Sequence, residues 1–355
     1  TGTGSREAAG TMRNPSSLVT QEAKVPCRVN LIGEWIDFNG GMVLPMALAP
    51  SVAVKIAANG TAMDRIKSTS FAASQDFAID APAGDHWSDY IRGALQYARD
   101  RNWIESGQEV SVESSIPVGA GLSSSAAIIV ATLKAASIGF PDVDGEALAF
   151  AAKEIENTFI GVPCGIMDQM AVALGKPGTV LALDTRDCSY ALLDLPDTWS
   201  VVVIHSGVRR ALSDGRYRAR RDQCLEAAAI LGVDCLCDAS LLSIDVLDGP
   251  LINRARHAIS EARRSREAIA ALRTGDRHTF GRLMNESHDS LRDDMEVSIP
   301  QIDQLVADAV SLGADGARIT GAGFGGCIVA LVELERMETW WSTLKHRHPA
   351  IEWIA

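Results

Sequence analysis

The chain has 355 residues, a formal net charge of −12, and an ordinary balance of 47% hydrophobic and 22% charged residues. This length exceeds what one hydrophobic core normally supports, so two lobes are expected. The negative charge and the lack of a long Lys/Arg block argue against binding to nucleic acid. No apolar stretch approaches the length of a membrane span. We therefore expect a small-molecule partner, with neither nucleic acid nor membrane involved.

Seven cysteines are scattered along the chain, and their odd number argues against a disulfide framework. We expect a reduced protein of the cytoplasm. Cys235 and Cys237 form a C-x-C pair without a neighbouring histidine or second cysteine pair, so no zinc site is predicted. Residues 1–20 are rich in Gly, Ser and Thr and lack the apolar core of a secretory signal, so we expect a flexible tail there.

Hydrophobic patterns predict an α+β protein with its strands concentrated in the first half. Strands are expected at 25–31, 42–47, 52–58, 110–115, 180–184 and 201–205. Helices are expected at 87–102, 124–136, 144–158 and 165–174. A more helical part follows, with helices at 218–231, 252–272, 277–290 and 299–312 and a closing strand pair at 318–320 and 327–333. We place the lobes at 21–195 and 196–355.

Residues 117–127, with the sequence PVGAGLSSSAA, are the most informative segment of the chain. Glycine lets the backbone turn its N–H groups toward a ligand, and a helix that begins there adds its free N–H groups and positive dipole end. A phosphate suits such a loop, and a serine hydroxyl can reach a magnesium ion. The alternative is an ordinary serine N-cap after a glycine-rich turn.

Residues 26–41 contain Glu34, Asp37 and Asn39 in a glycine-bounded loop between two expected strands. Ionised carboxylates are strong acceptors for sugar hydroxyls, and the aromatic ring of Trp35 can lie against a sugar face. A polar turn anchored by one buried tryptophan explains the same residues.

Residues 161–170 follow Glu156 and place Asp168 in the first turn of an expected helix. The helix dipole stabilises an acid there, which also explains the residue without any function. The functional interpretation is an ionised base or charge stabiliser beside an incoming hydroxyl. Glu156 lies near the end of the preceding helix, where the dipole disfavours it, so a cation such as magnesium or an arginine is its expected partner.

Residues 320–327 form a four-glycine loop before an apolar strand. The loop is not a dinucleotide fingerprint, because a strand follows it, and the chain has no Walker A lysine. It allows a close backbone approach to a ligand or to another loop, although a hairpin turn has the same composition.

Together, these runs resemble, in order and spacing, the three motifs of the GHMP kinases, which include galactokinase, homoserine kinase, mevalonate kinase and phosphomevalonate kinase. A specific resemblance to galactokinase is found in residues 26–41, 163–169, 254–257, 286–294 and 324–327. The similarity covers about residues 24–335. It implies an α+β fold with a ribosomal-protein-S5-like N-terminal lobe, a ferredoxin-like C-terminal lobe and an active site in the cleft between them.

The resemblance implies an ATP- and Mg²⁺-dependent kinase that phosphorylates the anomeric hydroxyl of galactose or a galacto-configured relative. Arg28 and Asp168 match the catalytic positions. The implied sugar contacts are Glu34, Trp35, Asp37, Gly165 and Tyr217. The implied ATP contacts are Trp87, Gly119, Ala120, Gly121, Leu122, Ser123, Ser124 and Ser125, and those for Mg²⁺ are Ser125 and Glu156. Trp87 also suits a core position, and either Arg209 or Arg210 matches a phosphate contact.

The chain departs from the family at the first motif, which usually reads G-E-H-T-D-Y-N. Trp35 replaces the histidine that usually helps to bind the sugar 6-hydroxyl, and Cys27 replaces the usual glycine before the arginine. Losing one partner of a buried hydroxyl costs about 1–3 kcal/mol. The alternatives are therefore a kinase for a C6-altered or N-acetylated galacto sugar, or a non-catalytic sugar sensor, which Ser125 and Glu156 argue against. We expect a monomer or weak homo-oligomer.

Overall fold

The computed structural model describes residues 20–117, 119–208 and 215–355, and the side chains of these residues apart from 71–73. The strands are β1 Gln21–Asn30, β2 Met42–Val43, β3 Pro45–Ala58, β4 Met63–Ser68, β5 Phe71–Ala78, β6 Gln108–Ser114, β7 Thr179–Asp184, β8 Tyr190–Asp194, β9 Trp199–His205, β10 Gly316–Ile319, β11 Cys327–Glu333 and β12 Glu352–Trp353. The helices are α1 Asp89–Asp100, α2 Ser124–Ala136, α3 Gly145–Ile155, α4 Met167–Leu174, α5 Arg216–Leu231, α6 Pro250–Thr274, α7 Arg277–Asp293, α8 Pro300–Ser311 and α9 Met337–Arg347.

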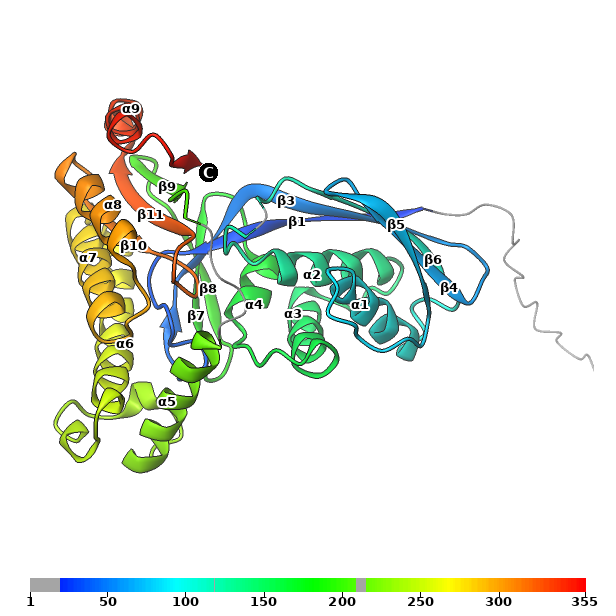
Figure 1. The fold of residues 1–355 in the computed structure, drawn as a ribbon, viewed down its shortest axis with the longest axis horizontal. Helices are drawn as coiled ribbons and strands as arrows, with labels where there is room; N and C mark the ends of the chain where they lie inside the picture. The colour runs from blue at the N-terminus through cyan, green and yellow to red at the C-terminus, as the bar shows by residue number, and fades with distance from the viewer. Residues whose placement is uncertain (1–19, 118, 209–214) are drawn as a thin grey trace, which may run out of the picture.

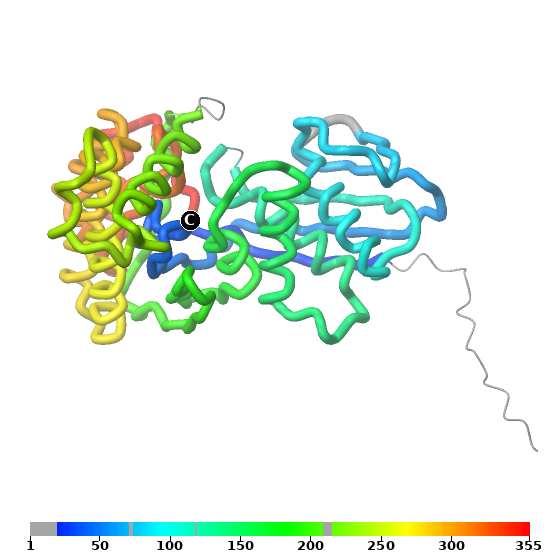
Figure 2. Tube along the Cα trace, turned by 90° about the horizontal axis from the view of Figure 1, so that it is seen from below, coloured from blue at the N-terminus to red at the C-terminus, as the bar shows by residue number. Residues whose placement is uncertain are grey.

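The first eight strands form one sheet, covered on one face by α1 to α4 (Figures 1 and 2). The strand order is β2-β7-β3-β6-β4-β5, with β1 paired to β3 and β8 paired to β7. Val52, Val54 and Ile56 alternate along β3 and are buried under α2, itself almost wholly apolar. This period-2 pattern is what a half-covered strand requires.

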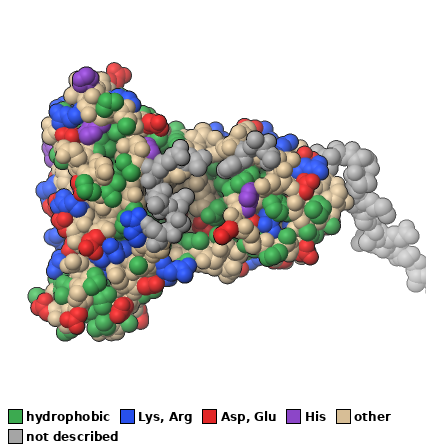
Figure 3. Space-filling model, viewed as in Figure 1, with side chains coloured by type: hydrophobic (Ala, Val, Ile, Leu, Met, Phe, Trp, Pro, Cys, Tyr) green, Lys and Arg blue, Asp and Glu red, His purple; other side chains and the backbone are tan. Residues whose placement is uncertain are grey.

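The last four strands form a second, antiparallel sheet in the order β10-β11-β9-β12. The helices α6, α7 and α8 stack beside it at the other end of the molecule (Figure 1). The first sheet ends with β8 and the second begins with β9, so the lobe boundary proposed at 195/196 lies in the connection between them. The face in Figure 3 intersperses acidic and basic side chains rather than gathering one sign.

The expected α+β mixture is confirmed, with three local differences. The segments 42–47 and 52–58, expected as two strands, are the short β2 and the long β3, which continues through Pro50. Proline is tolerated there because the β1–β3 register shifts between Pro26 and Arg28, which leaves Pro50 outside the ladder. The β4–β5 hairpin and α9 are not predicted from the sequence, because their polar, partly exposed residues give weak periodicity.

The second lobe holds the loop after β1 through buried polar contacts. Arg318 of β10 is fully buried and donates from Nε to the Leu31 carbonyl at 2.7 Å and from Nη2 to the Asn30 carbonyl at 2.7 Å. Its Nη2 also lies 3.2 Å from Oε1 of Glu34. From α6, Glu261 accepts a hydrogen bond from the Gly33 amide at 2.9 Å. These contacts fix residues 30–34 from the opposite lobe.

In the part of the chain that the structure describes, no helix is both long and apolar enough to cross a membrane. All seven cysteines lie within that part, and no disulfide links any two of them there.

We expect Arg318→Met to destabilise the protein by about 3–5 kcal/mol, because it leaves the Glu34 carboxylate buried without its cation. The measurement is the free energy of unfolding in urea. The control is Arg282→Met on α7, whose guanidinium forms an exposed ion pair with Glu286, and we expect it to cost less than about 1 kcal/mol. Equal losses in the two variants would contradict the inter-lobe role of Arg318.

Candidate active site

A cavity of about 570 Å³ collects nearly all of the predicted site residues. Its lining comes from the loop after β1, the start of α2, the end of α3, the start of α4, the start of α5 and residues 321–322. The predicted residues that line it are Arg28, Glu34, Trp35, Asp37, Trp87, Gly119, Gly121, Leu122, Ser123, Ser124, Ser125, Glu156, Gly165, Asp168 and Tyr217. Ala120 does not; it is buried in the core of the first lobe. Arg209 and Arg210 lie outside the described residues.

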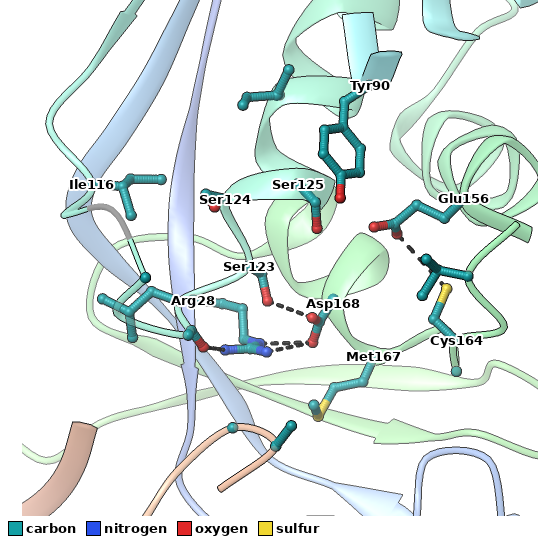
Figure 4. Close-up of a pocket in the computed structure, with 18 of the residues that line it drawn as sticks. Arg28, Tyr90, Ile116, Ser123, Ser124, Ser125, Glu156, Cys164, Met167 and Asp168 are labelled. Carbon is teal, nitrogen blue, oxygen red and sulfur yellow. Dashed lines mark hydrogen bonds and ion pairs between the residues drawn. The ribbon is translucent and has the colours of Figure 1, made fainter. Parts of the chain in front are cut away.

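At the centre of the cavity, Arg28 and Asp168 form a close ion pair (Figure 4). Nε and Nη2 of Arg28 lie 2.8 and 2.7 Å from Oδ1 of Asp168. The β1 register shifts just before Arg28, and such a bulge redirects a side chain out of the ladder. Arg28 is 5% exposed and Asp168 is 32% exposed, so the carboxylate is the more accessible member of the pair.

The glycine-rich loop at residues 119–125 approaches this pair from α2. Gly119 and Gly121 have φ of 78° and 76°, a backbone conformation that glycine adopts without strain. The carbonyl of Gly121 accepts a hydrogen bond from Nη1 of Arg28 at 3.1 Å. Ser123 is not the side-chain N-cap that the alternative interpretation supposed: its Oγ donates to Oδ2 of Asp168 at 2.5 Å.

Glu156 begins a single π-helical turn, Glu156–Ile160, that follows α3. Burial raises the pKa of its carboxyl above the ordinary value, opposed by hydrogen bonds from Ser125 and Gln169. Within the described ranges, no Lys or Arg pairs with Glu156. Tyr90 points toward Ser125 and Glu156 (Figure 4).

A buried carboxylate beside a serine hydroxyl suits a hard cation such as Mg²⁺, which needs only one or two protein oxygens when phosphates and water supply the rest. Ser125 and Glu156 therefore fit the predicted magnesium ligands. No group of three or more His, Cys, Asp or Glu suited to a metal occurs among the described residues, which is consistent with that sparse ligand set.

Two more acidic side chains, Glu34 and Asp37, face the same cavity and differ in their interaction partners. Glu34 is buried, and its Oε1 accepts hydrogen bonds from Thr320 Oγ1 at 2.9 Å and from the Gly321 amide at 2.6 Å. Asp37 forms no ion pair among the described residues: burial, then Asp168 and Glu34, raise its pKa from 3.8 to about 7, although Arg28 opposes the shift. Gly165 packs on Asp37 so closely that a Cβ there would lie 1.9 Å from the carboxylate oxygen.

Trp35 is held rigidly at one side of the cavity. Its φ of 64° is left-handed, and its side chain is 4% exposed. The ring lies against Tyr217 with centroids 4.8 Å apart and meets Phe38 edge-on at 6.2 Å. The indole Nε1 is buried and has no hydrogen-bond partner among the residues that the structure describes. A left-handed backbone conformation is unfavourable for tryptophan, and two aromatic rings hold this side chain in place while its N–H donor is unused. Such features indicate that the shape of this part of the site is important.

Further lining residues were not singled out from the sequence. Tyr90 and Cys164 lie at the Glu156 end, and Gly321 and Ala322 come from the second lobe. Only the four-glycine loop gave a signal for the last two, through its capacity for close approach. Cys164 lies within the motif at 161–170 but was not predicted as a site residue, and Tyr90 has no local signal, because α1 approaches Glu156 only in the folded chain.

Comparisons with known proteins agree with this geometry. Family models match the GHMP kinases N terminal domain at 89–176, the GHMP kinases C terminal domain at 268–345 and the galactokinase galactose-binding signature at 20–58. A galactokinase from Roseiflexus sp. (strain RS-1) is 42% identical over 329 residues, which cover 89% of this chain and 84% of the relative.

Solved structures show the same fold. Lactococcus lactis galactokinase complexed with galactose superposes with a TM-score of 0.87 at 29% identity, covering 94% of this chain and 92% of that one. Methanococcus jannaschii mevalonate kinase superposes with a TM-score of 0.70 at 19% identity, covering 94% and 96%. The fold predicted from the motifs is confirmed.

Asp37→Asn should stabilise the free protein more at pH 8 than at pH 5. The folded-state pKa of Asp37, about 7, lies above its ordinary 3.8, so the folded chain binds an extra proton between these values and loses stability as the pH rises from about 4 to 7, with only part of that loss present at pH 5. Asparagine removes that ionisation, which is worth at most about 4 kcal/mol, since one pKa unit equals about 1.4 kcal/mol.

The measurement is the free energy of unfolding of both proteins at the two pH values. Asp245→Asn, an exposed position, is the control and should show the same difference from the wild type at pH 5 and pH 8. An Asp37→Asn effect that is equal at both pH values would refute the assignment.

Proposed function

This chain belongs to the galactokinase family of the GHMP kinases, and we propose that it transfers the γ-phosphate of ATP to the anomeric hydroxyl of galactose or a galacto-configured relative. The products are the sugar 1-phosphate and ADP. One observation carries the residue assignment: the Arg28–Asp168 pair faces the glycine-rich loop at 119–125 within a single cavity.

Asp168 acts as the general base in this proposal. The anomeric hydroxyl loses its proton to Oδ2 of Asp168, the sugar oxygen bonds to the γ-phosphorus, and the bond from that phosphorus to the bridging oxygen breaks, which releases ADP. Arg28 pairs with the carboxylate of Asp168 and opposes the negative charge on the sugar oxygen and the moving phosphoryl group. Both contributions are matters of position and charge, which is what phosphoryl transfer mainly requires.

The donor side is assigned to the loop and the start of α2. The backbone N–H groups of 119–125 and the α2 N-terminus suit the triphosphate, and Trp87 suits the adenine. Ser125 and Glu156 would hold Mg²⁺, which would offset the charge of the transferring phosphates. Buried Glu156 without a Lys or Arg partner in the described ranges supports this assignment.

The acceptor side is assigned to Glu34, Trp35, Asp37, Gly165 and Tyr217, which surround one end of the cavity. A galacto sugar altered at C6 is a second candidate substrate, and the state of Trp35 favours it. The buried, ring-locked indole stands where the family usually has a hydrogen-bonding histidine, and it fills space without giving its donor to a partner in the described part of the chain. The Arg28–Asp168 pair argues against a non-catalytic sensor.

We further infer a cytoplasmic enzyme whose partner is a small sugar. Seven cysteines that no disulfide links within the described ranges suit a reducing compartment. A monomer or weak homo-oligomer is sufficient, because the described part of a single chain supplies every residue assigned to the reaction.

Asp168→Asn should lower kcat by about 10²–10⁴-fold, because the amide cannot take the proton. The measurement is ADP release coupled to a reporter enzyme, with galactose and its relatives as acceptors. Asp245→Asn serves again as the control and should keep wild-type turnover. Undiminished turnover in Asp168→Asn would remove this residue from the mechanism.

Trp35 predicts that a 6-deoxy, uronic or C6-truncated galacto sugar has a higher kcat/KM than galactose. Trp35→His should reverse the preference by about 5- to 150-fold, since a hydrogen bond to a buried hydroxyl is worth about 1–3 kcal/mol. The measurement is kcat/KM over a panel of sugars that differ only at C6. The prediction fails when galactose is the best substrate of the wild type.

A further inference from the structure

Asp168 has its acceptor positions unequally occupied. Oδ1 accepts a hydrogen bond from Nε of Arg28 at 2.8 Å and lies 2.7 Å from Nη2 in an ion pair, while Oδ2 accepts from Ser123 at 2.5 Å and from no other group among the described residues (Figure 4). Each carboxylate oxygen offers two lone pairs. Oδ1 therefore faces the Arg28 guanidinium, and one acceptor position is left on Oδ2. The Ser123 hydroxyl and the Arg28 guanidinium together determine where that remaining position points.

The backbone conformation of Ser123 is unfavourable, so the surrounding residues must hold it in place. Its φ of 58° and ψ of 42° are left-handed, a conformation that a non-glycine residue seldom adopts. The residue is 7% exposed and precedes α2, yet its hydroxyl caps no amide of that helix. The hydroxyl instead reaches Asp168, 45 residues further along the chain. Unfavourable backbone geometry that persists in a site points to a role there.

The glycine-rich loop thus forms a hydrogen bond with each member of the ion pair. Ser123 holds Asp168 by its side chain, and Gly121 holds Arg28 by its carbonyl at 3.1 Å. Both contacts come from the segment assigned above to the triphosphate. The loop therefore contacts both members of the ion pair, and these contacts connect the donor side of the cavity to the acceptor side.

We propose that Ser123 is a positioning residue for phosphoryl transfer, acting through Asp168 rather than on ATP. Its hydroxyl holds the Asp168 carboxylate so that the free lone pair on Oδ2 faces the acceptor hydroxyl. The same contact fixes the position of the carboxylate relative to the phosphate-binding loop. This inference rests on the proposed function and assigns Ser123 a task different from the ATP contact implied by the family resemblance.

The test compares Ser123→Gly and Ser123→Ala in the full-length protein. Both variants remove the hydroxyl, but glycine accepts the left-handed backbone and alanine does not. We expect both to lower kcat by roughly 10²-fold, the usual loss for a misplaced catalytic group. We expect KM for the sugar and for ATP to stay within about threefold of wild type, as befits a group that acts in the transition state. The melting temperature of Ser123→Gly shows whether the fold is retained.

A second measurement separates positioning from nucleotide binding. The equilibrium affinity for ATP with Mg²⁺ is measured by calorimetry in Asp168→Asn with and without Ser123→Gly, where no turnover is needed. We expect the same affinity in both, and no further loss of residual kcat in the double variant, because Ser123 acts through Asp168. A weaker affinity for ATP with an unchanged kcat would overturn the proposal.

The outcomes also distinguish this inference from the proposed function. Wild-type turnover that Asp168→Asn abolishes and Ser123→Gly leaves intact would overturn only the role of Ser123. A wild-type protein that phosphorylates no galacto sugar would overturn the proposed function, and the role of Ser123 with it.

Discussion

The buried polar junction between the two lobes is the constraint on which the site depends. Residues 30–34 follow β1 in the first lobe, yet Arg318 and Glu261 of the second lobe hold their backbone. Burying such charges is costly unless each one is paired and hydrogen-bonded. Here the requirement is met: burial alone raises the pKa of Glu261, but Arg264, His257 and Arg318 lower it to about 2. The junction therefore favours a single relative placement of the loop that carries Glu34 and Trp35.

The cavity that this junction shapes is rich in acids. Asp37, Glu156 and Asp168 line it, and Arg28 is the cation that pairs with Asp168 there. Burial first, and then neighbouring carboxylates, raise the pKa values of Asp37 and Glu156. A site of this kind gives up stability in the free protein, and ligands that bring hydroxyl donors or a divalent cation relieve the repulsion. Its composition suits a polar sugar on one side and a metal-bound phosphate chain on the other.

Trp35 gives the acceptor end of the cavity its own character. The stacking on Tyr217 and the edge contact with Phe38 make a rigid apolar wall within an otherwise polar subsite. A rigid wall discriminates by shape, whereas a histidine discriminates by hydrogen bonding. Membership of the galactokinase family thus defines the reaction, whereas a role for Trp35 in the choice of sugar is our proposal.

The sequence alone determined the family, the α+β class, most helices, and about half of the residues that line the cavity, because these depend on local signals. Glycine spacing reveals the loop at 119–125, and helical periodicity places Asp168 in a first turn. Tertiary structure decided what each side chain does. Ser123 is of a residue type that commonly caps helices, but its hydroxyl donates a hydrogen bond to Asp168, because α4 brings the carboxylate within reach. Glu34 is of a residue type that suits sugar binding, but one of its oxygens already accepts hydrogen bonds from Thr320 and Gly321. Ala120 lies in the phosphate motif but faces the core. Such roles come from contacts between residues far apart in the chain, which no local pattern encodes.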